Sequence, residues 1–248
     1  MDLSLPNPML KYLTPLDWLP TAEDLPDCDS TPVDSELQEF IPSFLKALLI
    51  EAWADRHDWF FGIDMGVYYS PDEPAIVPDG FLALGVDRIK SENLRLSYVL
   101  WEEQVLPKLV LEVVSKKYRG EYSTKKAFYE SLGVLYYVVY NPRRKRKAPL
   151  EVYKLIQGSY VQMVGNPVWF PELQIGIGRE RYNYGGYDRD WLFWYDEQNQ
   201  RYLTTRERMD IERVRAEEER VRADSAEERA QRLAERLRSL GVNPDEIE

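Results

Sequence analysis

The stretch Pro107–Pro142, PKLVLEVVSKKYRGEYSTKKAFYESLGVLYYVVYNP, has the pattern of a strand, a short helix and a second strand. Its first apolar run, residues 108–114, is typical of a buried strand, and VLYYVVY at 134–140 is typical of another. Between them, a helix is expected from about Ser123 to Leu132, because Gly133 is a common C-terminal stop. This order predicts an α/β domain whose sheet carries helices on its faces.

Glu112 is the anomaly in this stretch, because it lies in the middle of the first apolar run. An ionised carboxylate in an apolar interior costs several kcal/mol unless another group pairs with it or coordinates it. The sequence therefore predicts a partner for Glu112, and that partner bears on function.

The composition limits the kinds of chemistry that the chain can perform. It has 248 residues, 44% of them hydrophobic, which is enough for a large globular body, and a net charge of -11 that disfavours indiscriminate binding to nucleic acid or anionic membranes. With one histidine, His57, and one cysteine, Cys28, it can build neither a Cys/His zinc site nor a disulfide framework. No stretch resembles a signal peptide or a membrane span, so a cytoplasmic protein without membrane contact is expected.

Three segments are expected along the chain. Residues 1–34 are rich in proline and aspartate and predict an irregular arm. Residues 35–204 form the body: a helix from about Ser35 to Asp55, strands within 59–69, two strands joined by a turn within 75–86, an edge strand at 96–103, and a hairpin at 150–164. The aromatic segment 187–204 is expected to pack on the sheet.

The tail, residues 205–248, is rich in Glu, Arg and Ala and has a heptad-like seam. A coiled coil that makes the protein a homo-oligomer is favoured over a solvated single helix. The seam residues alternate spacings of three and four: Ala223, Ala226, Ala230, Leu233, Leu237 and Leu240.

Three residues outside the tail could carry chemistry together. Asp79 follows Pro78 at the turn into a strand, Glu112 lies within the next strong apolar strand, and Lys125 lies on the short helix after it. If the two strands are neighbours, the carboxylates converge, and a divalent cation such as Mg²⁺ or Mn²⁺ would relieve their repulsion. Such a cation lowers the pKa of bound water, and a nearby lysine could orient that water or hold a phosphate.

The motifs VPDG, LVLEVVS and KKAFYESLGVLYYVVYNP resemble the signature of the Uma-two family, a set of bacterial proteins in the PD-(D/E)XK nuclease superfamily. The resemblance covers roughly residues 35–180, and the arm and charged tail are similar to longer cyanobacterial members. It implies a restriction-endonuclease-like core, in which Asp79 and Glu112 would be metal ligands.

The chain departs from the superfamily pattern at several positions. The usual lysine position, two residues beyond Glu112, is Val114, so the resemblance implies that Lys125 takes its place, with Lys126 and Lys116 as alternatives. Asn141 stands where the family usually has aspartate. A first-helix glutamate often joins the site in the superfamily, and the candidates here are Glu36 and Glu39.

These observations predict a metal-dependent endonuclease that hydrolyses DNA phosphodiester bonds. The alternative is a catalytically inactive nuclease-fold protein that acts in assembly through its tail. The basic turn RRKRK, residues 143–147, is either a charged loop between strands or a DNA contact.

Overall fold

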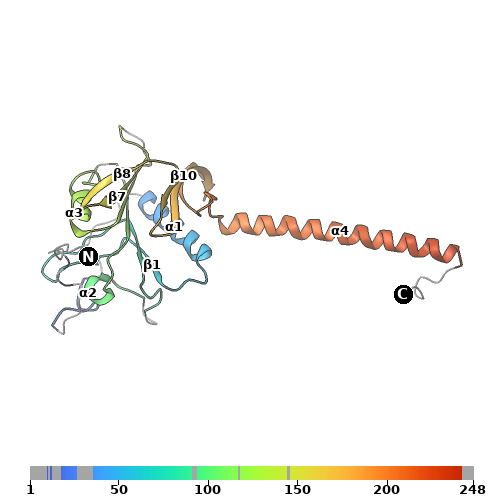
Figure 1. Ribbon diagram of the computed structural model, residues 1–248, viewed down its shortest axis with the longest axis horizontal. Coiled ribbons are helices and arrows are strands. Elements are labelled where there is room, and N and C mark those ends of the chain that lie inside the picture. The colour runs from blue at the N-terminus through green and yellow to red at the C-terminus, as the bar shows by residue number, and fades with distance from the viewer. Residues whose placement is uncertain are drawn as a thin grey trace. The chain divides into compact units, whose positions relative to one another are not determined.

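The computed structural model describes residues 10, 12, 18–26, 36–90, 94–116, 118–143 and 146–241. The chain divides into two compact units, Met1–Tyr202 and Leu203–Glu248. Among its described residues the first unit contains three sheets and three helices, and the second contains one helix. Figure 1 shows these elements along the chain.

A six-stranded mixed sheet in the order β1-β3-β5-β6-β7-β8 forms the centre of the first unit. Only the pair β5–β6 is parallel, because helix α3 (Thr124–Leu132) connects these two strands, and the other neighbours are antiparallel. The strands are β1 (Trp59–Ile63), β3 (Gly80–Leu84), β5 (Leu109–Val113), β6 (Tyr136–Tyr140), β7 (Leu150–Ile156) and β8 (Ser159–Met163).

Two smaller sheets complete the unit. An antiparallel sheet in the order β11-β10-β9 consists of β9 (Val168–Phe170), β10 (Ile175–Tyr184) and β11 (Tyr187–Tyr195). A parallel pair joins β2 (Val67–Tyr68) to β4 (Tyr98–Val99), and the short helix α2 (Leu100–Glu103) follows at once.

The central sheet separates two apolar layers, because alternate residues of each strand point to opposite faces. On one face, Leu109, Leu111 and Val113 pack with helix α1 (Glu36–Ala52) and with the β9–β11 sheet. On the other face, Val110 and Val114 pack with α3. Trp194 ties the first layer together, since its indole N–H donates to the backbone oxygen of Leu45 at 2.9 Å.

The mixed α/β architecture expected from the sequence is confirmed, and the differences are local. Within 75–86 only the second strand forms, while Ile76 makes a single bridge to Val67. The segment 96–103 is not one edge strand, because its second half is α2. The segment 187–204 supplies β11 to the second sheet, whose hydrogen-bonded strands the sequence did not predict.

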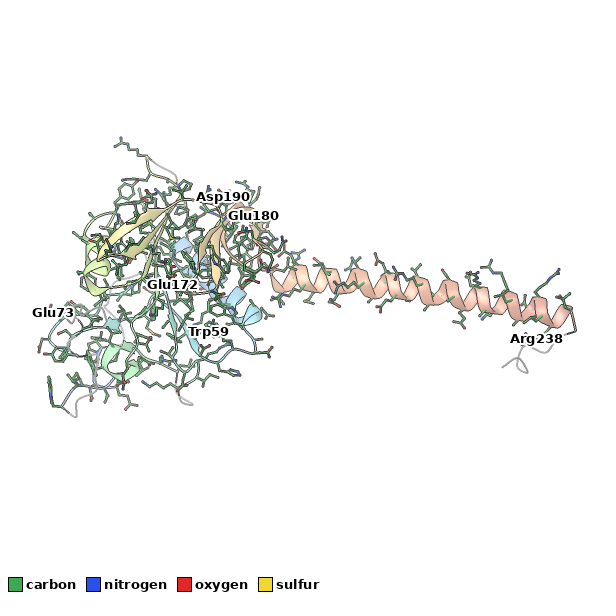
Figure 2. All side chains as sticks on the ribbon, viewed as in Figure 1. Trp59, Glu73, Glu172, Glu180, Asp190 and Arg238 are labelled. Carbon is green, nitrogen blue, oxygen red and sulfur yellow. The ribbon has the colours of Figure 1, made fainter. Side chains whose placement is uncertain are left out.

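The second unit contains helix α4 (Thr205–Ser239), which begins with a capping box between Thr204 and Glu207. None of its side chains is buried, and Figure 2 shows them lining the helix as far as Arg238. No helix in the described part of the chain is both long and apolar enough to cross a membrane.

Candidate active site

Asp79 and Glu112 lie opposite each other on one face of the central sheet. The last paired residues of β3 and β5 are Gly80 and Leu111, so Asp79 faces Glu112 one step further along this antiparallel pair. Glu112 points to the same face as Val110 and Val114, two residues before and after it, which belong to the layer against α3. Asp79, two residues before Phe81, points to that face as well. The two carboxylates therefore share the α3 face.

The carboxylate of Asp79 is held in place by β5 and α1. Its Oδ2 accepts a hydrogen bond from the backbone N–H of Val113 at 2.6 Å, and its Oδ1 accepts one from Nε2 of Gln38 at 3.3 Å. A Cβ at Gly80 would lie 3.4 Å from Cβ of Pro42, one helical turn after Gln38, which is an ordinary van der Waals distance. The part of α1 with Gln38 and Pro42 therefore lies beside the start of β3.

Glu112 has two partners, and both come from α3. Its side chain is only 1% exposed; Oε2 accepts from Nζ of Lys125 at 2.6 Å, and Oε1 accepts from the hydroxyl of Tyr129 at 3.0 Å. Lys125 and Tyr129 are four residues apart and therefore lie on the same face of the helix. The partner expected for the buried glutamate is thus Lys125, with Tyr129 as a second donor.

The electrostatics of the site differ between its two carboxylates. Burial raises the pKa of Asp79 to about 8, and the charge of Glu112 adds to the shift. Burial also raises the pKa of Glu112, but Lys125 and Tyr129 oppose that shift. Burial works to lower the pKa of Lys125, yet the Glu112 carboxylate outweighs it and raises that pKa overall. Lys125 therefore remains a cation at neutral pH.

The oxygen atoms at this site suit a small divalent cation. Mg²⁺ binds in proteins through one or two carboxylates, with water and phosphate oxygens completing the shell. Besides Asp79 and Glu112, Oε1 of Gln38 is buried and has no hydrogen-bond partner among the described residues, so a third oxygen is available. No group of three His, Cys, Asp or Glu with metal-binding geometry occurs in the parts of the chain that the structure describes.

The first helix contributes an amide rather than a carboxylate. Glu36 and Glu39 are both exposed, and Glu36 accepts a hydrogen bond from the hydroxyl of Tyr187 at 3.1 Å. Gln38, which the sequence did not single out, is the α1 side chain in contact with Asp79. A search for acidic side chains could not have found it, and its position depends on α1 packing against β3.

Among the lysine candidates, Lys125 is the one that reaches Glu112. Lys126 instead places its Nζ 3.5 Å from the centroid of the Tyr153 ring, and Lys116 is exposed on the loop after β5. Asn141, at the end of β6, is buried, and its Oδ1 accepts from the backbone N–H of Arg143 at 3.2 Å. It therefore closes the following turn.

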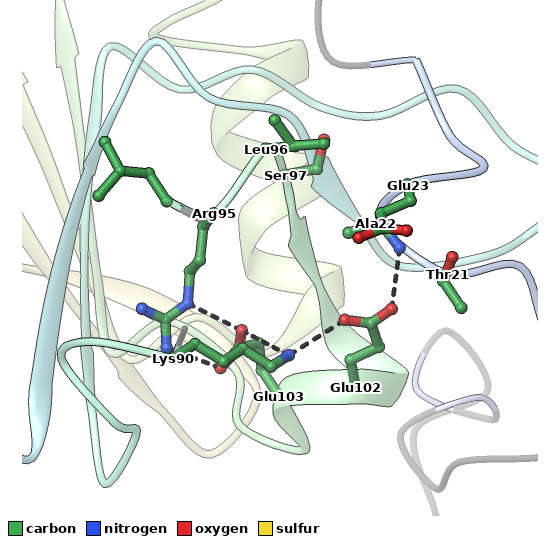
Figure 3. A pocket seen from close by; sticks show the side chains of 10 residues that line it. Thr21, Ala22, Glu23, Lys90, Arg95, Leu96, Ser97, Glu102 and Glu103 are labelled. Carbon is green, nitrogen blue, oxygen red and sulfur yellow. Dashed lines mark hydrogen bonds and ion pairs between the residues drawn. The ribbon is translucent and has the colours of Figure 1, made fainter. Parts of the chain in front are cut away.

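A separate pocket of about 870 Å³ lies beside α2 (Figure 3). Its charged groups pair with one another: Lys90 contacts Glu102 and Glu103 at 3.0 and 3.2 Å, and Arg95 contacts Glu103 at 2.8 Å. Glu102 also accepts from the backbone N–H of Ala22 at 2.8 Å. These pairs anchor residues 21–23 to the body, and their charges are already neutralised.

The comparisons with known proteins concern this same region. The sequence matches the profile of the Uma2 family, described as "Putative restriction endonuclease", over residues 30–178. No curated protein is a match. A solved structure described as a "putative nuclease belonging to DUF820", from Anabaena variabilis, matches with 14% sequence identity and a TM-score of 0.42, over 62% of this chain and 90% of that chain.

Proposed function

Because the chain belongs to the Uma2 family, described as "Putative restriction endonuclease", we propose that it is a nuclease that hydrolyses phosphodiester bonds of DNA with the help of Mg²⁺ or Mn²⁺. The family match supports the reaction class and DNA as the substrate. The dependence on a cation is supported by the chemistry of the oxygen ligands described above.

In this proposal Asp79 and Glu112 hold the cation, and the amide oxygen of Gln38 is a third candidate ligand. A bound cation would neutralise charge on the scissile phosphate and lower the pKa of a water molecule. Lys125, cationic and hydrogen-bonded to Glu112 at 2.6 Å, would orient the attacking water or contact a phosphate oxygen. Tyr129 would keep Glu112 in one orientation, because the Tyr129 hydroxyl donates a hydrogen bond to Oε1, the carboxylate oxygen that Lys125 does not contact.

One observation carries the proposal. The 2.6 Å hydrogen bond from the backbone N–H of Val113 to Asp79 joins the turn before β3 to the strand that contains Glu112. It keeps a desolvated carboxylate beside a second one, an arrangement that raises the pKa of Asp79 and that a cation would stabilise.

The test is DNA cleavage by the full chain with Mg²⁺ or Mn²⁺, on supercoiled, linear duplex and single-stranded DNA. We expect the wild type to cut and Glu112→Ala to lose activity, while Glu73→Ala, which changes an exposed glutamate, remains active. If folded wild type cuts none of these forms, the alternative of a catalytically inactive assembly protein is supported instead.

A further inference from the structure

Two loops meet at the edge of the sheet where the candidate site lies. Strands β5 and β6 are parallel, so the loop after β5 (114–122) and the turn after β6 (141–149) leave the sheet at the same edge. The backbone N–H of Val114 donates to the oxygen of Tyr140 at 2.8 Å, and Nζ of Lys147 lies 4.9 Å from the centroid of the Tyr122 ring. The two segments are therefore in contact.

These loops are strongly basic in an acidic chain. Together they contain eight lysines and arginines and one acidic residue, whereas the whole chain has a net charge of -11. The acidic residue, Glu121, is only 3% exposed. The described basic residues are all exposed: Lys116, Arg119, Arg143, Arg146 and Lys147. A polyanion that approaches this edge therefore meets positive charge, although the rest of the protein repels it.

Tyr118 places an exposed aromatic ring within this basic surface. Its side chain is 51% exposed, and its ring meets that of Tyr122 in a T-shaped contact with the ring centroids 5.4 Å apart. It stands between Lys116 and Arg119 in the sequence. An exposed aromatic ring between cations is the usual arrangement for stacking on a nucleic-acid base while phosphates are neutralised beside it.

The loop with Tyr118 is also fixed to the helix that contributes Lys125. The backbone oxygen of Gly120 accepts from the N–H groups of both Ser123 and Lys125 at 2.9 Å, and the φ of Gly120 is +92°, which favours glycine. Glu121 is buried directly after it. The backbone two residues after Tyr118 is therefore fixed to α3, the helix that contributes Lys125 to the candidate site.

We propose that Tyr118 stacks on an unpaired DNA base while Lys116, Arg119 and Lys147 contact the neighbouring phosphates. The preferred DNA is then single-stranded, or has an unpaired nucleotide next to the bond that is cut, a conclusion that rests on the proposed nuclease function. In an intact duplex the base faces are covered by stacked neighbours, so Tyr118 could contact only the backbone.

The experiment measures binding separately from cleavage. Full-length Glu112→Gln protein is titrated into fluorescein-labelled single-stranded and duplex oligonucleotides of equal length, and anisotropy is recorded. We expect Tyr118→Ala, in this background, to weaken single-strand binding by roughly five- to one-hundred-fold and to change duplex binding by less than about two-fold. Tyr118→Phe retains the ring and should bind as its parent does.

Tyr187→Ala is the matched control, because Tyr187 is 45% exposed and lies at the start of β11, in the β9–β11 sheet. Equal weakening of both DNA forms, no effect of Tyr118→Ala, or no binding to either form would overturn the inference. Cleavage by the wild type is measured on the same oligonucleotides. If the wild type cuts DNA but Tyr118→Ala binds single strands normally, only this inference is refuted. If Tyr118→Ala weakens single-strand binding but the wild type cuts nothing, the base-stacking role of Tyr118 is supported and the proposed nuclease activity is refuted.

Discussion

Replacing Asp79 by asparagine removes a carboxyl group whose ionised form is disfavoured by burial, and it keeps the shape of the side chain. In the wild type, the backbone N–H of Val113 donates to Oδ2 of Asp79 at 2.6 Å. The Oδ1 atom of an asparagine at this position can accept the same hydrogen bond. Its NH₂ group can donate to Oε1 of Gln38, a buried oxygen without a hydrogen-bond partner among the described residues. When the Gln38 amide turns over, the substitution exchanges the bond from Nε2 of Gln38, now 3.3 Å, for one to Oε1, and the number of hydrogen bonds stays the same.

The effect on stability depends on pH, because the pKa of Asp79 is raised to about 8 in the folded protein, whereas in an unfolded chain it is about 4. The stabilisation from a raised carboxyl pKa is fully present below about pH 4 and is lost as pH rises to about 8. Over this window the wild type loses up to about 1.4 kcal/mol per pH unit relative to Asp79→Asn. At pH 7 we expect the variant to be more stable by about 2–4 kcal/mol.

Urea unfolding in EDTA at pH values from 4 to 8 measures this difference. The gap in unfolding free energy should be smallest at pH 4 and should widen steadily, whereas the exposed Asp72→Asn control should show no such trend. Added Mg²⁺ should stabilise the wild type and not Asp79→Asn, since the variant lacks one of the two proposed carboxylate ligands. A variant less stable than the wild type at pH 7, or a gap independent of pH, would refute the reasoning.

Four further substitutions or truncations give independent tests. Lys125→Ala leaves Glu112 buried without its cation and should cost about 3–5 kcal/mol in urea unfolding at pH 8 and less at pH 4, where Glu112 takes up a proton; a loss independent of pH would contradict the ion pair. Tyr129→Phe should lower the unfolding free energy by about 2 kcal/mol and weaken Mn²⁺ binding in calorimetry, and unchanged values would show that its hydrogen bond is unimportant. Gln38→Leu should weaken Mn²⁺ binding without lowering metal-free stability, and unaltered affinity would remove its amide from the ligand set. Deleting residues 205–248 should lower the mass seen by light scattering, and an unchanged mass would reject a coiled coil.

The residues that could be predicted from sequence are those whose positions follow from local pattern. Glu112 could be placed on a strand by its apolar neighbours, and Lys125 on a helix by the stop at Gly133, where the chain turns with a φ of +93°. Asp79 could be placed at the start of a strand because it follows Pro78 in a turn. Once β3 and β5 pair, these local positions bring the two carboxylates together.

The features that the sequence did not indicate depend on packing between distant segments. Gln38 reaches Asp79 across 41 residues of chain, because α1 lies beside the start of β3, and no spacing rule connects the two residues. The segment 96–103 divides into β4 and α2 because Val99 pairs with Tyr68 of β2. Helix α2 then turns Glu102 and Glu103 toward Lys90.

The two carboxylates of the site are stabilised in different ways, and this difference determines how the proposed cation would bind. Glu112 receives its compensation from the chain, through Lys125 and Tyr129, so its burial needs no metal. Asp79 receives two hydrogen bonds but makes no ion pair with a described lysine or arginine, and with a pKa of about 8 it keeps a proton at neutral pH. A cation must displace that proton, so its affinity should rise with pH up to about 8. Because Lys125 already compensates the charge of Glu112, the proposed ligand whose proton would make cation binding depend on pH is Asp79.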